Sequence, residues 1–206
     1  MKQLPKISLL VLGLIITWTA TAQVQFSVGA IQTNSVNTVS GVGGTDNSIV
    51  NSGYYVGAAL EKAIPNRDNL LYNVGIAYSY FGGALGGMTT KYNSVNVPFR
   101  IKYRYELSGG SLPVGFFVYA GPLFSIGLSA TENHESNPYL SVKNVSLYDK
   151  NILNRFDMKI GAGLGLDLAK HFIFKAGYDY GVLDISAVEG SETHISYMHI
   201  GLGYQF

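Results

Sequence analysis

Three observations predict an all-β fold, an eight-stranded antiparallel up-and-down transmembrane β-barrel. Apolar residues alternate with small or polar ones in repeated segments of about ten residues, the length that a tilted strand needs to cross a bilayer. The last residues, 194–206, alternate in this way and end on the aromatic Phe206. The first residues have the pattern of an export signal, so the chain is expected to leave the cytoplasm.

The N-terminus is typical of a secretory signal peptide. Lys2 and Lys6 precede an apolar run at residues 7–16, and Ala20 and Ala22 then form an A-x-A pattern of small residues. The run is shorter than the roughly 18 to 20 residues of a spanning helix, which disfavours an uncleaved anchor. We therefore predict a cleaved signal peptide at residues 1–22 and a single outer-membrane β-barrel domain at residues 23–206.

Period-two alternation places eight strands along that domain. The expected ranges are 23–32, 53–64, 70–81, 93–106, 114–128, 156–168, 172–183 and 194–206. Brief turns alternate with longer connections, which fall at about 33–52, 82–92, 129–155 and 184–193. Outer-membrane barrels have short periplasmic turns and long extracellular loops, so both termini are expected in the periplasm of a Gram-negative cell.

The fourth expected strand shows how its two faces differ. Phe99 and Ile101 alternate with Arg100, Lys102 and Arg104. Charges at every second position belong in the lumen of such a barrel, and the apolar set belongs against lipid. A soluble β-sandwich or lipocalin-like barrel is the alternative, but its large residues would then face inward and crowd a small barrel.

Two prolines interrupt neighbouring expected strands. Pro98 lies in the fourth and Pro122 in the fifth, and the short turn between these strands brings the two prolines nearly opposite each other. Proline cannot donate a ladder hydrogen bond. We therefore predict a bulge or a local separation of the fourth and fifth strands at this point.

Composition excludes several classes of protein. The chain has no cysteine, which excludes disulfides and a lipid attached through cysteine. Its net charge is +1 and only 13% of its residues are charged, so no basic surface for nucleic acid is expected. Stability must come from closure of the barrel and from packing.

Several motifs together resemble a known family. They are the sequence at residues 97–103 (VPFRIKY), the sequence at 119–122 (YAGP), and the glycine-rich residues 161–167 followed by 176–181. Their order, with the terminal Phe206, resembles the PorT-like "outer membrane protein β-barrel domain" family of Bacteroidota over about residues 23–206. The resemblance implies a porin-like outer-membrane barrel. One branch of the family is associated with a protein-secretion system, and no functional residue is carried over.

The C-terminal aromatic residue also implies a route of assembly. Phe206 resembles the signal that the bacterial barrel-assembly machinery recognises in the last strand. The expected partners are therefore outer-membrane lipid, this machinery, and an extracellular or secretion-system partner.

Charged residues on the expected inward faces form the candidate site. An eight-stranded barrel is just wide enough inside for side chains to fill it, and buried charges must be paired. We therefore predict a filled lumen, with an open pore that attracts anions as the alternative. The predicted network consists of Glu61, Arg100, Lys102, Arg104, Asp157, Lys159, Asp167, Lys175, Asp179 and His199.

Glycines at residues 161, 163 and 165 superficially resemble a phosphate-binding loop. Their spacing of two and the lack of a following helix instead indicate glycines that line the lumen, where facing side chains need room.

Other chemistry has little support in the sequence. The histidines, His134, His171, His194 and His199, have no metal-ligand spacing, so neither a metal nor a cofactor is expected. Ser129, Glu132 and His134 are close in sequence, but proximity in a loop is not a catalytic triad.

The sequence therefore predicts a non-enzymatic integral outer-membrane barrel with a largely filled polar lumen. Its extracellular loops, above all residues 129–155, are expected to have structural or partner-binding roles because loops on rigid scaffolds usually carry specificity. The alternative is a small porin-like barrel that transports a small solute.

Overall fold

The computed structural model describes residues 22–39, 47–85, 88–107, 113–135 and 141–206. These residues contain nine strands. Their bounds are β1 (Gln23–Val39), β2 (Asn47–Ile64), β3 (Arg67–Leu85), β4 (Met88–Leu107), β5 (Val114–Glu135), β6 (Ser141–Ser146), β7 (Phe156–Leu168), β8 (Phe172–Gly181) and β9 (Ser191–Gln205).

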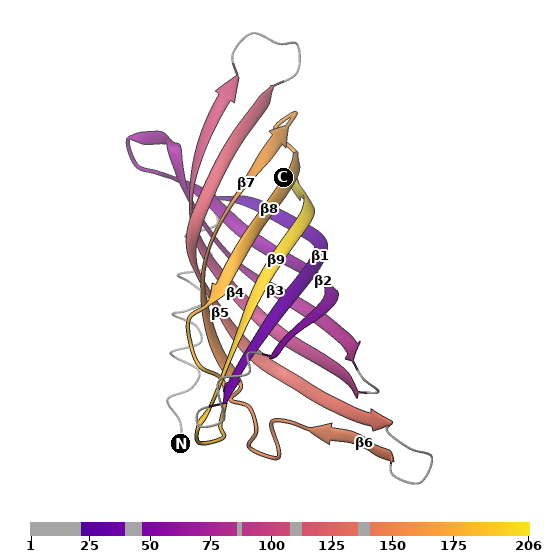
Figure 1. Cartoon of the computed structure of the whole chain (residues 1–206). Coiled ribbons are helices and arrows are strands. Elements are labelled where there is room, and N and C mark those ends of the chain that lie inside the picture. Colours follow the sequence, from indigo (N-terminus) through magenta and orange to yellow (C-terminus); the bar gives the residue numbers. More distant parts are fainter. Residues whose placement is uncertain (1–21, 40–46, 86–87, 108–112, 136–140) are drawn as a thin grey trace, which may run out of the picture.

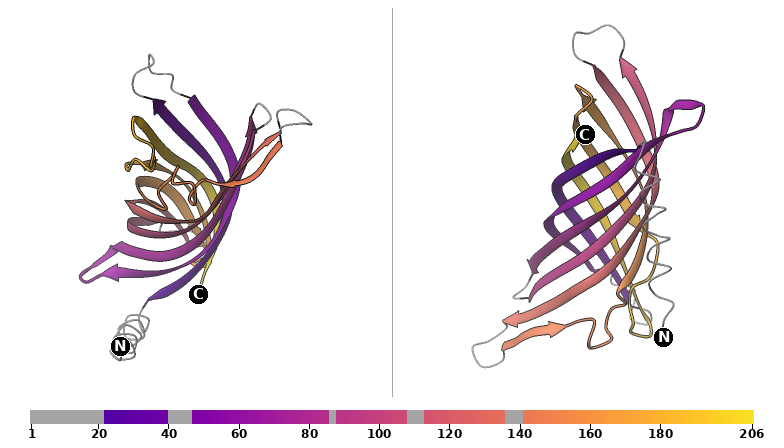
Figure 2. Two further views of the ribbon diagram at one scale, coloured as in Figure 1. Left: turned by 90° about the horizontal axis from the view of Figure 1, so that it is seen from below. Right: turned by 180° about the vertical axis from the view of Figure 1, so that it is seen from behind.

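Eight of these strands form a closed ring. The order around the ring is β4-β3-β2-β1-β9-β8-β7-β5, and pairing of β4 with β5 closes it. Every pairing is antiparallel, and the first strand pairs with the last through Gln25↔Gln205. The predicted eight-stranded up-and-down barrel is therefore confirmed, and its strands wrap obliquely around a common axis (Figures 1 and 2).

The ninth strand corrects the prediction for residues 129–155. That connection was expected to be a loop, but β6 lies within it and pairs with the end of β5 through Thr131↔Ser146. The β5–β7 ladder stops at Ile126↔Phe156, so the rest of β5 has an edge whose backbone groups need partners. β6 supplies some of them, at the end of the barrel opposite the C-terminus (Figure 1).

The first five strands are longer than predicted, at 17 to 22 residues. The connections expected at 33–52 and 82–92 are mostly strand, and Thr33 pairs with Asn51 inside the first of them. A ladder is held by backbone hydrogen bonds, so it continues through polar residues after hydrophobic alternation has stopped. The alternation therefore marks the lipid-facing part of each strand and misses its extension.

The later strands are close to prediction. The bounds of β7 are those expected, while β8 ends two residues early and β9 begins three residues early. Short turns follow β2 and β7 at the end that carries the C-terminus (Figure 1). The second turn contains Ala169 and Lys170 at positive φ angles of 53° and 63°, a conformation that fits a tight hairpin.

The two faces of β4 are divided as its sequence predicts. Phe99 and Ile101 are 42% and 40% exposed on the outside of the ring, whereas Arg100 and Lys102 are 7% and 4% exposed on the inside. The described residues contain no helix that is long and apolar enough to span a membrane. The predicted signal peptide at residues 1–22 lies outside the described residues apart from Ala22, and it stays a prediction.

Candidate functional site

One end of the lumen holds two cations and two carboxylates in mutual contact. The Lys102 ammonium lies 3.2 Å from an oxygen of Glu61 and 3.2 Å from an oxygen of Asp167. The Arg104 guanidinium contacts the same two carboxylates, at 2.5 Å and 2.7 Å. Because β4 presents alternate residues inward, both cations reach carboxylates from β2 and β7, and the cluster ties three strands together.

The middle of the lumen holds a chain of four polar side chains. Arg100 of β4 forms an ion pair with Asp179 of β8. The other oxygen of Asp179 lies 3.3 Å from Nδ1 of His199, whose Nε2 lies 2.8 Å from the Tyr119 hydroxyl. With Nδ1–H donating to the carboxylate, Nε2 accepts a hydrogen bond from the Tyr119 hydroxyl, so every member of this chain has a partner.

The predicted irregularity between β4 and β5 lies beside Arg100. The β4–β5 ladder breaks after Pro98↔Leu123 and resumes at Ile101↔Ala120. Gly121 lies opposite the break with φ of +151°, and the side chain of Arg100 donates to its carbonyl oxygen. The ladder is therefore interrupted near the two prolines, but the strands stay close together, because a Cβ atom on Gly121 would lie 3.2 Å from the Cα atom of Arg100.

A further ion pair lies toward the opposite end of the barrel. Lys159 is fully buried and pairs with Asp157 of the same strand, β7. Its ammonium also lies 3.4 Å from the Ser125 hydroxyl and 4.2 Å from the centre of the Tyr197 ring. A cation over the face of an aromatic ring is attracted by the negative potential of that face.

Lys175 has a different environment. Its ammonium lies 3.3 Å from the Ser27 hydroxyl and 5.4 Å from the centre of the Tyr55 ring. No carboxylate of the described residues forms an ion pair with it. Lys175 lines a lumen cavity of about 130 Å³.

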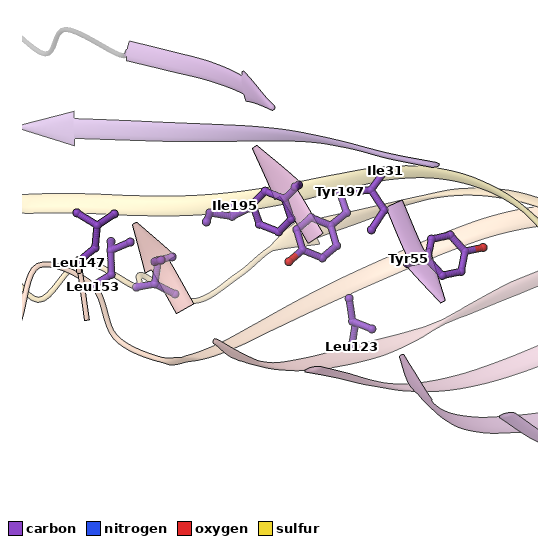
Figure 3. Close-up of a cluster of buried hydrophobic side chains, with 10 residues drawn as sticks. Ile31, Tyr55, Leu123, Leu147, Leu153, Ile195 and Tyr197 are labelled. Carbon is purple, nitrogen blue, oxygen red and sulfur yellow. The ribbon is translucent and has the colours of Figure 1, made fainter. Parts of the chain in front are cut away.

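An apolar cluster fills the lumen beyond the charged residues (Figure 3). Three of its members that lie outside the strands, Leu147, Leu153 and Ile185, come from connections that the sequence analysis expected to be extracellular loops. These connections therefore fold back into the mouth of the barrel. The whole set is Ile31, Tyr55, Phe81, Leu123, Ala130, Leu147, Leu153, Ile185, Ile195 and Tyr197, with Tyr92 and Tyr148 packed against it.

Sequence reasoning described the lumen as polar and missed this cluster. A signal was present in the apolar residues Leu147, Ile152 and Leu153 of segment 144–155, but periodicity does not reveal where a loop packs. The side chain of Tyr148 is enclosed by the same packing. Burial, with a smaller contribution from Tyr197, raises the pKa of Tyr148 to about 12.

Comparison with known proteins identifies the family. The profile of the family described as "Outer membrane protein beta-barrel domain" matches residues 18–187, which is more than half of the chain. The chain belongs to this family. It is therefore a β-barrel protein of the bacterial outer membrane.

Solved structures of outer-membrane barrels are similar to this β-barrel domain at low sequence identity. Ail, the attachment invasion locus protein of Yersinia pestis, is 14% identical over 90% of this chain and 99% of its own, with a TM-score of 0.40. Neisserial surface protein A is 16% identical over 88% and 97%, with a TM-score of 0.47. The outer membrane enzyme PagL is 12% identical over 84% and 97%, with a TM-score of 0.38. No curated protein matches the chain.

The glycines of β7 in this β-barrel domain make room for side chains of the lumen, as predicted. A Cβ atom on Gly163 would lie 2.3 Å from the Tyr119 ring, and one on Gly165 would lie 2.2 Å from the Phe117 ring. A Cβ atom on Gly161 would meet a carboxylate oxygen of Asp179 at 1.9 Å. These distances are far below van der Waals contact, so β7 must have no side chain at these three positions.

The residues of the predicted network thus lie in three groups, and Lys175 belongs to none of them. The groups are Glu61, Lys102, Arg104 and Asp167; Arg100, Asp179 and His199; and Asp157 and Lys159. Within the described residues, no group of three or more histidine, cysteine, aspartate or glutamate side chains is arranged to hold a metal ion. The paired charges fix one another in place, because each buried cation has a carboxylate or a polar neighbour.

Proposed function

We propose that this barrel is a non-conducting, non-enzymatic protein of the outer membrane, with a structural or partner-binding role outside the cell. The observation that carries the proposal is the double filling of the lumen, by ion pairs at one end and by apolar side chains at the other. Each filling alone is an obstacle to a hydrated ion, for a different physical reason.

The ion pairs obstruct the lumen by linking strands across it. Lys102 and Arg104 on β4 share carboxylates from β2 and β7, and Arg100 reaches Asp179 on β8. A permeating ion would have to compete with these partners for the same charges. Breaking a buried ion pair leaves an uncompensated charge, which costs about 3 to 5 kcal/mol.

The apolar cluster obstructs the lumen by excluding water. Leu147 and Leu153 are 5% and 9% exposed, so the segment that carries them is packed rather than extended into solvent. A solvated ion that entered this region would lose hydration without gaining a polar partner. We therefore infer that the segment 147–153 blocks the mouth of the barrel to hydrated ions.

The outer part of the barrel supports the partner-binding role. At about 3.4 Å per residue, strands of 17 to 22 residues extend well beyond the roughly 9 to 11 residues that cross a bilayer. Arg155 stacks on the Tyr148 ring at 4.6 Å and donates to the carbonyl of Leu128 at 3.0 Å, which holds the long connection against β5. A surface that is already ordered loses less entropy when it binds a partner.

The proposal includes the finer assignments made from the sequence. We place both termini in the periplasm, because the short turns lie at the end of the barrel that carries the C-terminus. We also assign a cleaved signal peptide, the PorT-like branch of the Bacteroidota, and insertion through the barrel-assembly machinery. The partner is an extracellular or secretion-system protein.

Single-channel recording in a planar bilayer tests the central claim. The refolded mature protein should give no conductance steps, and its heat-modifiable migration on a gel should verify that the barrel is closed. Neutralising Lys91, which is exposed on the outside of β4, should change nothing and serves as the control. Steady, salt-dependent conductance whose ion selectivity changes in the Arg100→Gln, Lys102→Gln and Arg104→Gln variants would contradict the proposal and support the porin-like alternative.

A further inference from the structure

The charged side chains that face the lumen do not balance. The cations are Arg100, Lys102, Arg104, Lys159 and Lys175, and the carboxylates are Glu61, Asp157, Asp167 and Asp179. Among these groups the four carboxylates are all engaged by the first four cations. The surplus positive charge is therefore localised on Lys175.

Lys175 also has hydrogen-bonding capacity left over. An ammonium group has three donors, and the described residues supply one acceptor, the hydroxyl oxygen of Ser27 at 3.3 Å. The ammonium lines the cavity of about 130 Å³, so its remaining donors have space beside them. A space of this size holds several water molecules or one small ion with water.

A second donor lies beside the same cavity. Tyr55 is 7% exposed, and its hydroxyl lies close to Ser27 but makes no hydrogen bond of good geometry with the described residues. Its ring lies 5.4 Å from the Lys175 ammonium. Figure 3 shows the Tyr55 hydroxyl turned away from the other labelled members of the apolar cluster. A buried hydroxyl without a partner is costly, which indicates that the site normally contains an acceptor.

The other charged groups around the cavity favour an anion as that acceptor. Arg100 and Lys102 line the cavity with Lys175, which makes three cations. The two carboxylates that line it, Glu61 and Asp179, are each held by two other groups, so neither is free to neutralise Lys175. His199 also lines the cavity and donates to Asp179 when its Nδ1 carries the proton.

We propose that the cavity beside Lys175 and Tyr55 binds one small monovalent anion, either a halide or a short carboxylate such as formate. One such anion accepts from the ammonium and from the phenol, and it brings the lumen charge to zero. The cavity of about 130 Å³ has room for an anion of this size. The inference goes beyond the proposed function, because a bound ion is required for charge balance whether or not the barrel conducts.

Anion-dependent stability tests the site without any measurement of transport. The mature protein is refolded into lipid vesicles in sodium gluconate, and urea unfolding is followed as chloride or formate replaces gluconate at constant ionic strength. A ligand that binds only the folded state raises the folding equilibrium constant in proportion to its concentration once it exceeds the dissociation constant. Wild type should therefore gain about tenfold in this constant for each tenfold rise in the anion that fits.

Three variants assign that effect to the site. Lys175→Met should abolish the anion dependence, while Lys91→Met, on the outside of β4, should keep it. Tyr55→Phe should weaken anion binding about tenfold or more, because it removes a hydrogen bond to a charged group. A response to chloride alone identifies a halide site, and a response to formate alone identifies a carboxylate site.

Two results would overturn the inference: stability of the wild type that is independent of both anions, or anion dependence that persists in Lys175→Met. If Lys175→Met does not fold, crystallography of the wild type decides instead. Crystals are grown in bromide and, separately, in formate. At least one of the two anions should occupy the space between the Lys175 ammonium and the Tyr55 hydroxyl, bromide as an anomalous peak or formate as electron density, and the absence of both would refute the site. None of these outcomes depends on conductance. If the anion site is refuted, the proposal that the barrel does not conduct is unaffected.

Discussion

Arg100 on β4 and Asp179 on β8 form an ion pair across the lumen, although β5 and β7 lie between their strands in the ring. The two residues are 79 positions apart in the chain. The strands that carry them are not ladder neighbours, so their contact needs β5 and β7 to be in place between them and the sheet to be curved. The pair joins two parts of the wall that the backbone hydrogen bonds connect only indirectly.

Loss of Arg100 should destabilise the barrel strongly. Arg100→Ala leaves Asp179 buried with only His199 as a partner, and we expect the free energy of unfolding to fall by about 3 to 5 kcal/mol. Urea unfolding of the refolded protein measures this. The control is Lys91→Ala, whose side chain is exposed on the outside of β4, and it should cost about 0.5 kcal/mol or less. Equal losses in the two variants would contradict a special role for the buried pair.

A methyl group at Gly127 should displace Tyr148 from the mouth of the barrel. A Cβ atom there would lie 1.8 Å from the Tyr148 hydroxyl oxygen, whereas one at Gly115 would meet its neighbours at 3.5 Å or more. In Gly127→Ala the released ring regains water, so its pKa should fall from about 12 toward the ordinary value near 10. Carbon-13 NMR of labelled tyrosine measures this pKa, and it should stay unchanged in Gly115→Ala.

Shortening Leu147 and Leu153 together should loosen the long connection and leave the ring intact. Each is buried in the apolar cluster, and a buried leucine-to-alanine change typically costs about 2 to 5 kcal/mol. We expect protease to cut the double variant between β5 and β7 while heat-modifiable migration persists. Ile152→Ala is the control, because Ile152 is 37% exposed. Loss of the folded barrel instead of local cleavage would show that the cluster supports the wall itself.

Lys170→Gly should stabilise the turn after β7. Lys170 has a φ angle of 63°, which costs a residue with a Cβ atom about 1 kcal/mol and costs glycine little. The expected gain in the free energy of unfolding is about 0.5 to 1 kcal/mol, measured in urea. Lys150 does not have a positive φ angle, so the control variant Lys150→Gly should show no gain in the free energy of unfolding.

Phe206→Ala should reduce the amount of barrel that reaches the outer membrane, if Phe206 is the assembly signal. Its ring packs edge-on against Phe26 at 5.9 Å, so the C-terminal residue completes the seam between β1 and β9. Quantification of folded protein in outer-membrane fractions measures the effect, and a severalfold decrease is expected. The control is Phe172→Ala, an exposed aromatic residue at the same end of the barrel. An equal decrease in both variants would contradict a signal specific to the last residue.

Hydrophobic alternation was sufficient to predict the eight strands of the ring and their inward faces. It works where one face meets lipid, because the contrast between Ile101 and Lys102 then reflects two different solvents. The inward direction of the cations on β4 followed from the same contrast. Family motifs placed the chain among outer-membrane barrels, as the match over residues 18–187 shows.

Features that depend on contacts between distant residues could not be predicted. Polar segments such as residues 33–39 extend a strand because β2 provides a ladder partner, and no residue type records that. The burial of Leu147 depends on how a connection folds back over the ring. The pairing of each lumen cation depends on strand register, so the isolation of Lys175 could be seen only in three dimensions.

The glycines of β7 make the residues tolerated on this strand depend on the neighbouring strands β5 and β8. Tyr119 occupies the space above Gly163, and Phe117 occupies the space above Gly165. A side chain can be gained on β7 only if an aromatic ring on β5 is lost at the same time. A Cβ atom on Gly163 would also lie 2.4 Å from the backbone carbonyl oxygen of Ala176, and one on Gly165 would lie 2.3 Å from that of Phe174. Loss of the ring alone therefore does not open either position, and both should remain glycine while the aromatic residues on β5 vary.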